Sequence, residues 1–223
     1  MISFIIPSYN NLDHLQNVYN SIQKHAPEAE VVLLDDGSTD GTWEWCQHVQ
    51  KNSPTGVKIF RSETRVGHTI LYDLGIGLAS NEIVGILHAD MILGPNYIQN
   101  TLKHLERGKV VCATRIEPPL HPPGKEKIIS NFGINFDTLD VKGFEEFCYS
   151  LQAEEQGKVT RGMFAPWLVY KEDFVKLGGH DPLFAPFPYE DSDLFQRFIL
   201  AGYDLIQSRD AFVYHLTCRG HRW

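Results

Sequence analysis

Short apolar runs alternate with amphipathic segments along the first half of the chain. Five runs lack polar alternation, which is typical of strands buried on both faces. They span residues 3–6, 31–34, 57–60, 83–87 and 110–113. Between them, apolar residues recur at helical spacing over residues 11–25, 39–50, 69–79 and 97–106. This alternation predicts an α/β fold with a Rossmann-like, mainly parallel central sheet flanked by helices on both faces.

The second half is less regular and begins with a break in the pattern. Residues 117–124 contain four prolines, which cannot sustain a helix or a central strand, so we expect a loop that could move as a flap. Further helices are expected at 143–155 and 191–201, and further strands at 164–170 and 211–215. We therefore expect one domain over residues 1–223, in which residues 116–223 form a smaller, irregular region.

Composition and charge narrow the class of protein. Lys and Arg number 20 against 28 Asp and Glu, a formal charge of −8, which argues against a dedicated nucleic-acid binder. The four cysteines form no Cys-x-x-Cys pair, so neither a zinc ribbon nor a disulfide framework is indicated. No apolar run approaches the ~20 residues of a transmembrane segment. Free thiols favour a reducing compartment, so we expect a cytoplasmic protein, free or peripheral to a membrane.

Polar clusters follow three of the predicted strands: Ser8-Tyr9-Asn10, Asp35-Asp36-Gly37-Ser38 and His88-Ala89-Asp90. Right-handed crossovers place the loops after parallel strands at one edge of the sheet, where ligands of open α/β sheets bind. The pair Asp35 and Asp36 needs a bridging group because like charges repel. Ser38 and the two residues after it are equally explained by a turn and a helix N-cap.

His88 and Asp90 occupy alternate positions and can share one face of an extended chain. Imidazole together with carboxylate suits Mn²⁺, and carboxylate alone suits Mg²⁺. The competing interpretation is a partly buried histidine that hydrogen-bonds to its neighbour. His215 ends the last apolar run and is either a core histidine or a further ligand, the second if its strand lies beside the fourth strand.

Another acidic cluster opens the predicted helix at 191–201. A carboxylate near a strand-end site can serve as a general base that accepts a hydroxyl proton. Acids in a first helical turn are also favoured by the helix dipole and by capping. The pattern leaves open which of Glu190, Asp191 and Asp193 faces the site.

In this order, the clusters resemble those of the family 2 glycosyltransferases with the GT-A fold, over nearly the whole chain. The first strand and loop, the Asp-Asp-Gly-Ser signature, the Gly-Ile…Ala helix, an Asp-x-Asp-like motif and the Glu-Asp block are all similar to this family. These motifs lie at residues 5–10, 33–42, 75–79, 86–90 and 177–203.

The resemblance implies a metal-dependent enzyme that moves one sugar from a nucleotide-diphosphate sugar, UDP-linked by family frequency, to an acceptor hydroxyl with inversion. It assigns residues 1–115 to the donor and 116–223 to the acceptor. The implied donor-binding residues are Pro7, Tyr9, Asn10, Asp36, Arg65, His68, His88, Ala89 and Asp90. The implied ligands of Mn²⁺ or Mg²⁺ are Asp90, His215 and His88. The implied catalytic residues are Asp191, as base, and Glu190.

The resemblance also assigns an acceptor side rich in aromatic residues, whose faces suit the C–H surface of a sugar. The acceptor-binding candidates are Trp167, Gly179, His180 and Tyr189, with Phe164, Phe184 and Phe187 nearby in sequence. The same aromatic residues would equally fill the core of a small subdomain.

The chain departs from the family pattern at two places. His88 stands where the first Asp of Asp-x-Asp is usual, which leaves the identity of the metal open. Tyr72 and Asp73 stand where Arg-Asn or Leu-Asn is frequent, which makes Arg65 and His68 the expected basic partners of the diphosphate.

Two other functions compete with sugar transfer. A nucleotidyltransferase of similar fold would need a basic, glycine-rich loop after the first strand, and residues 7–11 contain no basic residue. A degenerate, non-catalytic nucleotide- or glycan-binding module fits His88 but not the intact Glu190-Asp191 pair. With no membrane helices, a processive synthase is disfavoured, whereas retention of configuration, seen in some GT-A relatives, stays open.

Overall fold

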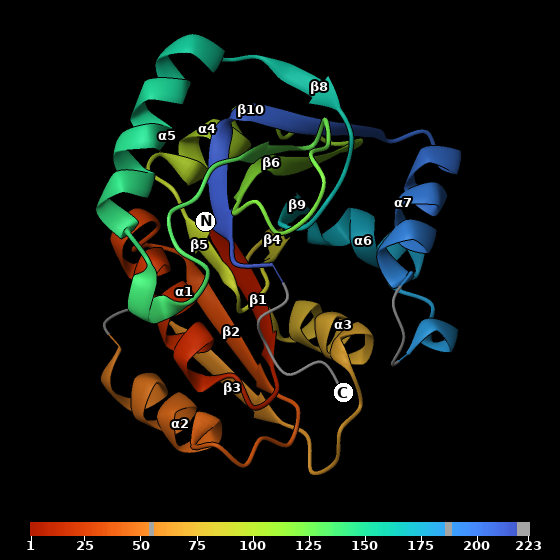
Figure 1. The fold of residues 1–223 in the computed structure, drawn as a ribbon. Coiled ribbons are helices and arrows are strands. Elements are labelled where there is room, and N and C mark those ends of the chain that lie inside the picture. Colours follow the sequence, from red (N-terminus) through yellow and green to blue (C-terminus); the bar gives the residue numbers. More distant parts are fainter. Residues whose placement is uncertain (54–55, 186–188, 218–223) are drawn as a thin grey trace.

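The computed structural model describes residues 1–53, 56–185 and 189–217. Within these residues, ten strands form one sheet (Figure 1). They are β1 (Ile2–Ser8), β2 (Glu30–Asp35), β3 (Val57–Arg61), β4 (Ile83–Ile86), β5 (Met91–Leu93), β6 (Lys109–Glu117), β7 (Lys127–Ile129), β8 (Val159–Arg161), β9 (Trp167–Tyr170) and β10 (Asp204–His215).

The strand order explains how distant segments meet. It is β3-β2-β1-β4-β9-β6-β10-β5, with β7 beside β6 and β8 beside β10. The strands β1 to β4 are parallel, whereas β9 is antiparallel to both of its neighbours, β4 and β6. Because β10 is parallel to β6, the carboxyl ends of β1, β2, β4, β6 and β10 all lie at the same edge of the sheet.

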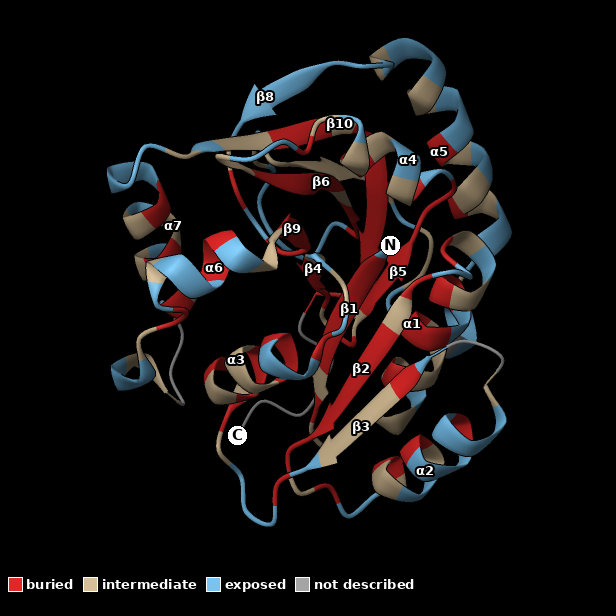
Figure 2. Ribbon diagram, turned by 180° about the vertical axis from the view of Figure 1, so that it is seen from behind, coloured by how far each residue is buried: buried red, intermediate tan, exposed pale blue. Residues whose placement is uncertain are grey.

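Helices cover both faces of this sheet. They are α1 (Leu12–His25), α2 (Thr42–Asn52), α3 (His68–Leu78), α4 (Tyr97–Leu102), α5 (Val141–Glu155), α6 (Lys171–Leu177) and α7 (Glu190–Leu200), with 3₁₀ turns at Phe136–Thr138 and Pro182–Phe184. Figures 1 and 2 show α1, α2 and α5 on one side of the sheet and α3, α6 and α7 on the other. None of the described helices is both long and apolar enough to cross a lipid bilayer.

The core lies along the central strands, whose residues are almost all buried (Figure 2). The helix α3 packs closely on this core because Gly75 faces the sheet, where a Cβ atom would collide with Ile5 and Leu34. The close contact brings the start of α3, at His68, to the edge where the strands end.

The structure confirms the α/β class and the mostly parallel central sheet, and it corrects several elements. The strands β6 and β10 are longer than the predicted runs, and Glu117 ends β6 instead of beginning a loop. The short strand β5 and the helix α6 were not predicted. His215 does not lie beside the fourth strand, since β9 and β6 separate β10 from β4. It reaches the site because β10 pairs with β5.

Candidate active site

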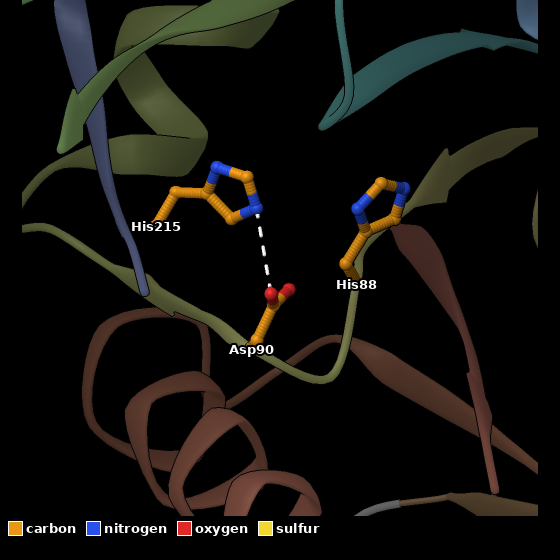
Figure 3. Close-up of side chains that lie close together, drawn as sticks. All are labelled: His88, Asp90 and His215. Atoms are coloured by element: carbon orange, nitrogen blue, oxygen red, sulfur yellow. Dashed lines mark ion pairs between the residues drawn. The ribbon is translucent and has the colours of Figure 1, made fainter. Parts of the chain in front are cut away.

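The turn between β4 and β5 carries the first cluster of side chains. It contains His88 and Asp90, and the pairing of β5 with β10 places Met91 opposite His215. The ligand atoms of His88, Asp90 and His215 all lie within 4.8 Å of one another. Figure 3 shows the two imidazole rings flanking the Asp90 carboxylate, with His215 Nε2 at 3.5 Å from Asp90 Oδ2. We call these three residues the metal cluster, because two imidazoles and a carboxylate form a ligand set that suits Mn²⁺.

Glu117, which the sequence analysis did not identify, orients His215. Its Oε1 lies 2.8 Å from His215 Nδ1, which leaves Nε2 free to face the cluster. Its other oxygen accepts a hydrogen bond from Lys127 at 2.8 Å. Although burial opposes ionisation, the hydrogen bonds from His215 and Lys127 and the charge of Arg115 lower the pKa of Glu117 to about 2. The only available signal was its position at a strand end, which the prolines after it obscured.

The two imidazoles of the metal cluster differ in their electrostatics. Burial lowers the pKa of His88 to about 4, so its ring is neutral at pH 7 and offers a lone pair. The ring stacks on Tyr72 with centroids 6.3 Å apart. For His215, the carboxylates of Asp90 and Glu117 outweigh burial and raise the pKa. A cation held by Nε2 would compete with that proton and release it.

The three acidic residues in the first turn of α7 have different surroundings. Glu190 is buried with Oε1 at 2.8 Å from His68 Nε2, and although burial opposes it, this hydrogen bond lowers the pKa of Glu190. Asp193 pairs with Arg197 at 2.7 Å. Asp191 keeps 30% of its side chain exposed, and burial of the rest together with the charge of Glu190 raises its pKa to about 6. Of the three, Asp191 therefore has the surroundings expected of a general base.

A histidine and a second carboxylate lie behind Asp191. The imidazole of His180 donates or accepts through Nδ1 at 2.6 Å from Asp73 Oδ1, and its Nε2 lies 4.0 Å from Asp191 Oδ1. We call Asp73, His180 and Asp191 the base cluster. His180 was assigned to acceptor binding, but only 1% of its side chain is exposed. It therefore contacts Asp73 and the interior instead of offering a surface to an acceptor.

The two carboxylates after β2 have separate partners, so no single group needs to bridge them. Asp35 Oδ1 accepts from Ser38 N at 3.0 Å, and Oδ2 lies 3.3 Å from Arg61 Nε. Asp36 accepts from the backbone N–H groups of Val66 and Gly67 at 2.7 and 3.0 Å. Asp36 therefore fixes the loop that leads into α3 and, through it, the position of His68.

The other donor-side candidates lie at the end of β1, in the loops after β1 and β3, and in the turn after β4. Pro7 is half-buried at the end of β1, and the Tyr9 ring carries the Arg65 guanidinium at 4.2 Å from its centroid. The Asn10 side chain accepts from Thr39 N at 2.8 Å, so it ties the first two loops together. Ala89 is buried between the two metal-cluster residues of its turn. His68, expected at the diphosphate, is bound to Glu190.

The acceptor-side candidates divide into buried and exposed residues. Trp167 is fully buried in β9 against Phe174 and Phe195, so it does not present the aromatic surface that the sequence analysis expects. At Gly179, a Cβ atom would collide with Asp73, so this glycine permits the contact between Asp73 and the loop. Tyr189 is 70% exposed, immediately before α7. Phe164 is exposed and Phe184 half-buried, while Phe187 lies outside the described residues.

Tyr72, also missed as a site residue, joins the two clusters. Its ring lies 5.6 Å from those of both His68 and His180 and stacks on His88. Burial and then the charges of Asp191, Glu190 and Asp90 raise its pKa. One aromatic ring of α3 thus lies between the metal cluster and the base cluster. In the sequence, Tyr72 and Asp73 stand out only as departures from a family pattern.

A family model matches most of the chain. The model described as "Glycosyl transferase family 2" matches residues 3–162, which is most of the chain. Among curated proteins, an uncharacterized glycosyltransferase, alr2836 of Nostoc sp., is 32% identical over 113 residues, or 49% of this chain and 34% of the Nostoc protein. The chain thus aligns with about a third of the length of such relatives.

Solved structures share the fold over almost the whole chain. A crystal structure of GalNAc-T7 with UDP, GalNAc and Mn²⁺ superposes with a TM-score of 0.73 at 19% identity, over 96% of this chain and 43% of the other. The mannosyltransferase PcManGT of Pyrobaculum calidifontis, in complex with GDP-Man and Mn²⁺, gives 0.70 at 19% identity, over 98% and 57% of the two chains. These likenesses establish the GT-A fold.

Proposed function

The chain belongs to glycosyl transferase family 2, and from this membership we propose that it moves a single sugar from a nucleotide-diphosphate sugar to an acceptor hydroxyl. The observation that carries the proposal is the position of Tyr72 between a metal-ligand set and a carboxylate whose pKa is raised to about 6. A sugar transferase needs both groups near one reacting carbon: one at the leaving diphosphate and one at the attacking hydroxyl.

The donor side consists of residues 1–115 in this proposal. The loops after β1 and β2, with Tyr9, Asp36 and Arg65, face the nucleoside, and Arg65 is the cation nearest to a diphosphate. UDP is the nucleotide we propose. The related structures contain UDP in one case and GDP-mannose in another, so GDP is the alternative to test.

The metal cluster fits a divalent cation. His215 is held through Nδ1 by Glu117, and burial favours the neutral form of His88, whose ring presents a nitrogen lone pair beside Asp90. His215 would present a second lone pair at Nε2 after losing the proton that Asp90 and Glu117 stabilise there. A bound Mn²⁺ or Mg²⁺ would stabilise the negative charge that grows on the nucleoside diphosphate as the glycosidic bond breaks. His88 in place of a first aspartate favours Mn²⁺, because imidazole is a better ligand for it than for Mg²⁺.

Residues 116–223 contribute the acceptor side, where Asp191 removes the proton of the acceptor hydroxyl. Its raised pKa brings it close to neutrality, where a base is most effective while remaining largely ionised at pH 7. The oxygen attacks the anomeric carbon directly as the diphosphate leaves from the opposite side, which inverts the configuration. Glu190 stays ionised against His68 and keeps this basicity high. Tyr189 is the exposed ring that we propose meets the acceptor sugar.

Two measurements test the proposal together. Thermal shifts with UDP, GDP, dTDP and CDP, in Mn²⁺ and in EDTA, should show a nucleotide-dependent rise only with the metal. Release of nucleoside diphosphate from UDP-glucose, UDP-N-acetylglucosamine and GDP-mannose, with water as default acceptor, reports turnover. Asp191→Asn should lose about 10²- to 10⁴-fold in turnover and keep the nucleotide shift.

Asp193→Asn is the matched control. It removes a carboxylate from the same helical turn, but one that pairs with Arg197, so turnover should stay near that of the parent. Equal turnover in the Asp191 and parent proteins would remove Asp191 from the role of base. A chain that no nucleoside diphosphate stabilises, with or without Mn²⁺, would contradict the proposal as a whole.

A further inference from the structure

His180 is a buried histidine in apolar surroundings. Its ring lies 5.6 Å from Tyr72, 6.3 Å from Trp167 and 5.5 Å from Phe174, measured between centroids. A polar ring in such a place needs hydrogen-bond partners, since a buried nitrogen without one loses its hydration and gains nothing in return. Each of its two ring nitrogens therefore needs a hydrogen-bond partner of its own.

Asp73 satisfies one of these nitrogens and fixes the ring. Its carboxylate lies 2.6 Å from His180 Nδ1 and also accepts from the His180 backbone N–H at 3.0 Å. Gly179, with a φ of 70°, allows this approach. A carboxylate against Nδ1 stabilises the tautomer in which Nδ1 carries the proton, so Nε2 has a lone pair.

The other nitrogen faces the candidate base without reaching it. His180 Nε2 and Asp191 Oδ1 are both buried, and neither has a hydrogen-bond partner among the described residues, although they lie 4.0 Å apart. Two acceptors that face each other repel unless a hydrogen lies between them. When Asp191 gains a proton it becomes a donor, and His180 Nε2 is the acceptor that faces it.

We propose that Asp73 and His180 are positioning residues for Asp191, which hold Nε2 where it receives the proton that Asp191 removes from the acceptor. This inference rests on the proposed function, in which Asp191 is the general base. The acceptor O–H proton passes to the Asp191 carboxylate as the new glycosidic bond forms and the bond to the diphosphate breaks. The same proton then moves to Nε2, which restores the carboxylate and leaves an imidazolium beside Asp73.

Such a contact acts on the rate because it is stronger after proton transfer than before it. The other groups near Asp191 do not replace it. Glu190 and its partner His68 form their own pair, the Tyr72 ring packs against His180, and the Trp167 indole N–H can donate to Asp191 but cannot accept a proton from it. His180 Nε2, in contrast, is a buried acceptor nitrogen without a hydrogen-bond partner among the described residues, and it faces Asp191.

The test uses His180→Phe, which can fill the space among three aromatic rings, and Asp73→Asn, which keeps the shape of the carboxylate. Turnover of UDP-glucose or GDP-mannose, whichever the parent hydrolyses, should fall about 10- to 100-fold in each variant, less than when the base itself is removed. The KM for the donor and the Mn²⁺-dependent nucleotide shift should stay at the parent's values. The acid limb of the pH profile of His180→Phe should move to higher pH, because His180 lowers the pKa of Asp191 and the substitution withdraws that effect.

The double variant should be no slower than the slower single variant, since both substitutions interrupt one pathway. Nitrogen NMR of the parent protein tests the inference even if the variants misfold. It should show His180 protonated at Nδ1 and unprotonated at Nε2 at pH 8.

The outcomes separate this inference from the proposed function. If Asp191→Asn is inactive while His180→Phe keeps the parent's turnover and pH profile, the positioning role is wrong and the base stands. An Nε2-protonated tautomer in the parent at pH 8 would also overturn it. If Asp191→Asn keeps the parent's turnover, Asp191 is not the base, and the inference for His180 fails together with the proposed function.

Discussion

The metal cluster and the base cluster are built in the same way, and we propose a different chemistry for each. Each holds a histidine whose Nδ1 contacts one carboxylate and whose Nε2 points toward another. Beside the metal cluster, His215 Nδ1 lies 2.8 Å from Glu117, and its Nε2 lies 3.5 Å from Asp90. In the base cluster, His180 Nδ1 lies 2.6 Å from Asp73, and its Nε2 lies 4.0 Å from Asp191. The histidines come from different parts of the fold, one from the end of β10 and one from the loop after α6.

The two clusters differ in the group that lies beside each carboxylate–histidine–carboxylate arrangement. In the metal cluster a second imidazole, His88, lies within 4.8 Å of the other ligand atoms and completes a set for a cation. In the base cluster the neighbour of Asp191 is another carboxylate, Glu190, whose charge adds to burial and raises the pKa of Asp191 to about 6. We therefore propose that a carboxylate–histidine–carboxylate arrangement binds a cation where a neutral imidazole lies beside it, as in the metal cluster. Where a second negative charge lies beside it, as in the base cluster, we propose that it binds a proton.

The largest expected effect tests whether the two clusters have separate roles. Asp90→Asn removes the carboxylate of the metal cluster, so the affinity for UDP in Mn²⁺ should fall by more than the 10- to 100-fold typical of losing an outer partner. Asp73→Asn makes the same change in the base cluster and should leave that affinity unchanged. Calorimetric titration of UDP at fixed Mn²⁺ measures both. Equal losses in the two variants would mean that the clusters do not have distinct roles.

A smaller effect tests the outer carboxylate. Glu117→Gln keeps an oxygen that can accept from His215 Nδ1 but removes the charge, so the affinity for Mn²⁺ should fall about 10-fold. Lys127→Met is the control, because it removes the other partner of Glu117 without touching His215. Manganese titrations followed by thermal shift compare the two. An unchanged titration in a folded Glu117→Gln protein would remove His215 from the ligand set.

Local sequence patterns predicted most of the fold because buried parallel strands and amphipathic helices follow from the order of apolar residues. The strands at 3–6, 31–34, 57–60 and 83–87 are all present in the structure. The short strand β5 was missed because three residues carry no periodic signal, and the first half of β10 because its polar residues interrupt the apolar run. The antiparallel place of β9 depends on tertiary packing, which no local pattern encodes.

The candidate site was predicted where chemistry follows directly from a strand end, and not where it depends on contacts across the fold. Strand ends identified Asp90 and His215, which the structure brings together. Glu117 and Asp73 act through histidines 98 and 107 residues away, so nothing nearby in the sequence revealed them. Trp167 was expected at the surface because aromatic density does not distinguish a sugar platform from a core, and the structure places it in the core.

A further expected effect is on stability, and it also distinguishes the clusters. The pKa of Asp191 is about 6 in the folded protein, against the ordinary value of 3.8. The folded state therefore binds this proton more tightly than the unfolded state does. The contribution of Asp191 to stability is most favourable below pH 3.8, falls as the pH rises to about 6, and stays low above it.

Asp191→Asn removes the charge that this burial disfavours, so the variant should be more stable than the parent at pH 8, by at most about 3 kcal/mol. The gain should vanish near pH 4, where the parent carboxyl is itself protonated. Urea denaturation at both pH values measures the difference. Asp90→Asn should show no such gain, because the carboxylate of Asp90 faces the His215 imidazole, whose positive charge it stabilises. A stability gain in Asp90→Asn as large as that in Asp191→Asn would mean that both carboxylates bear the same penalty, and the contrast between the clusters would fail.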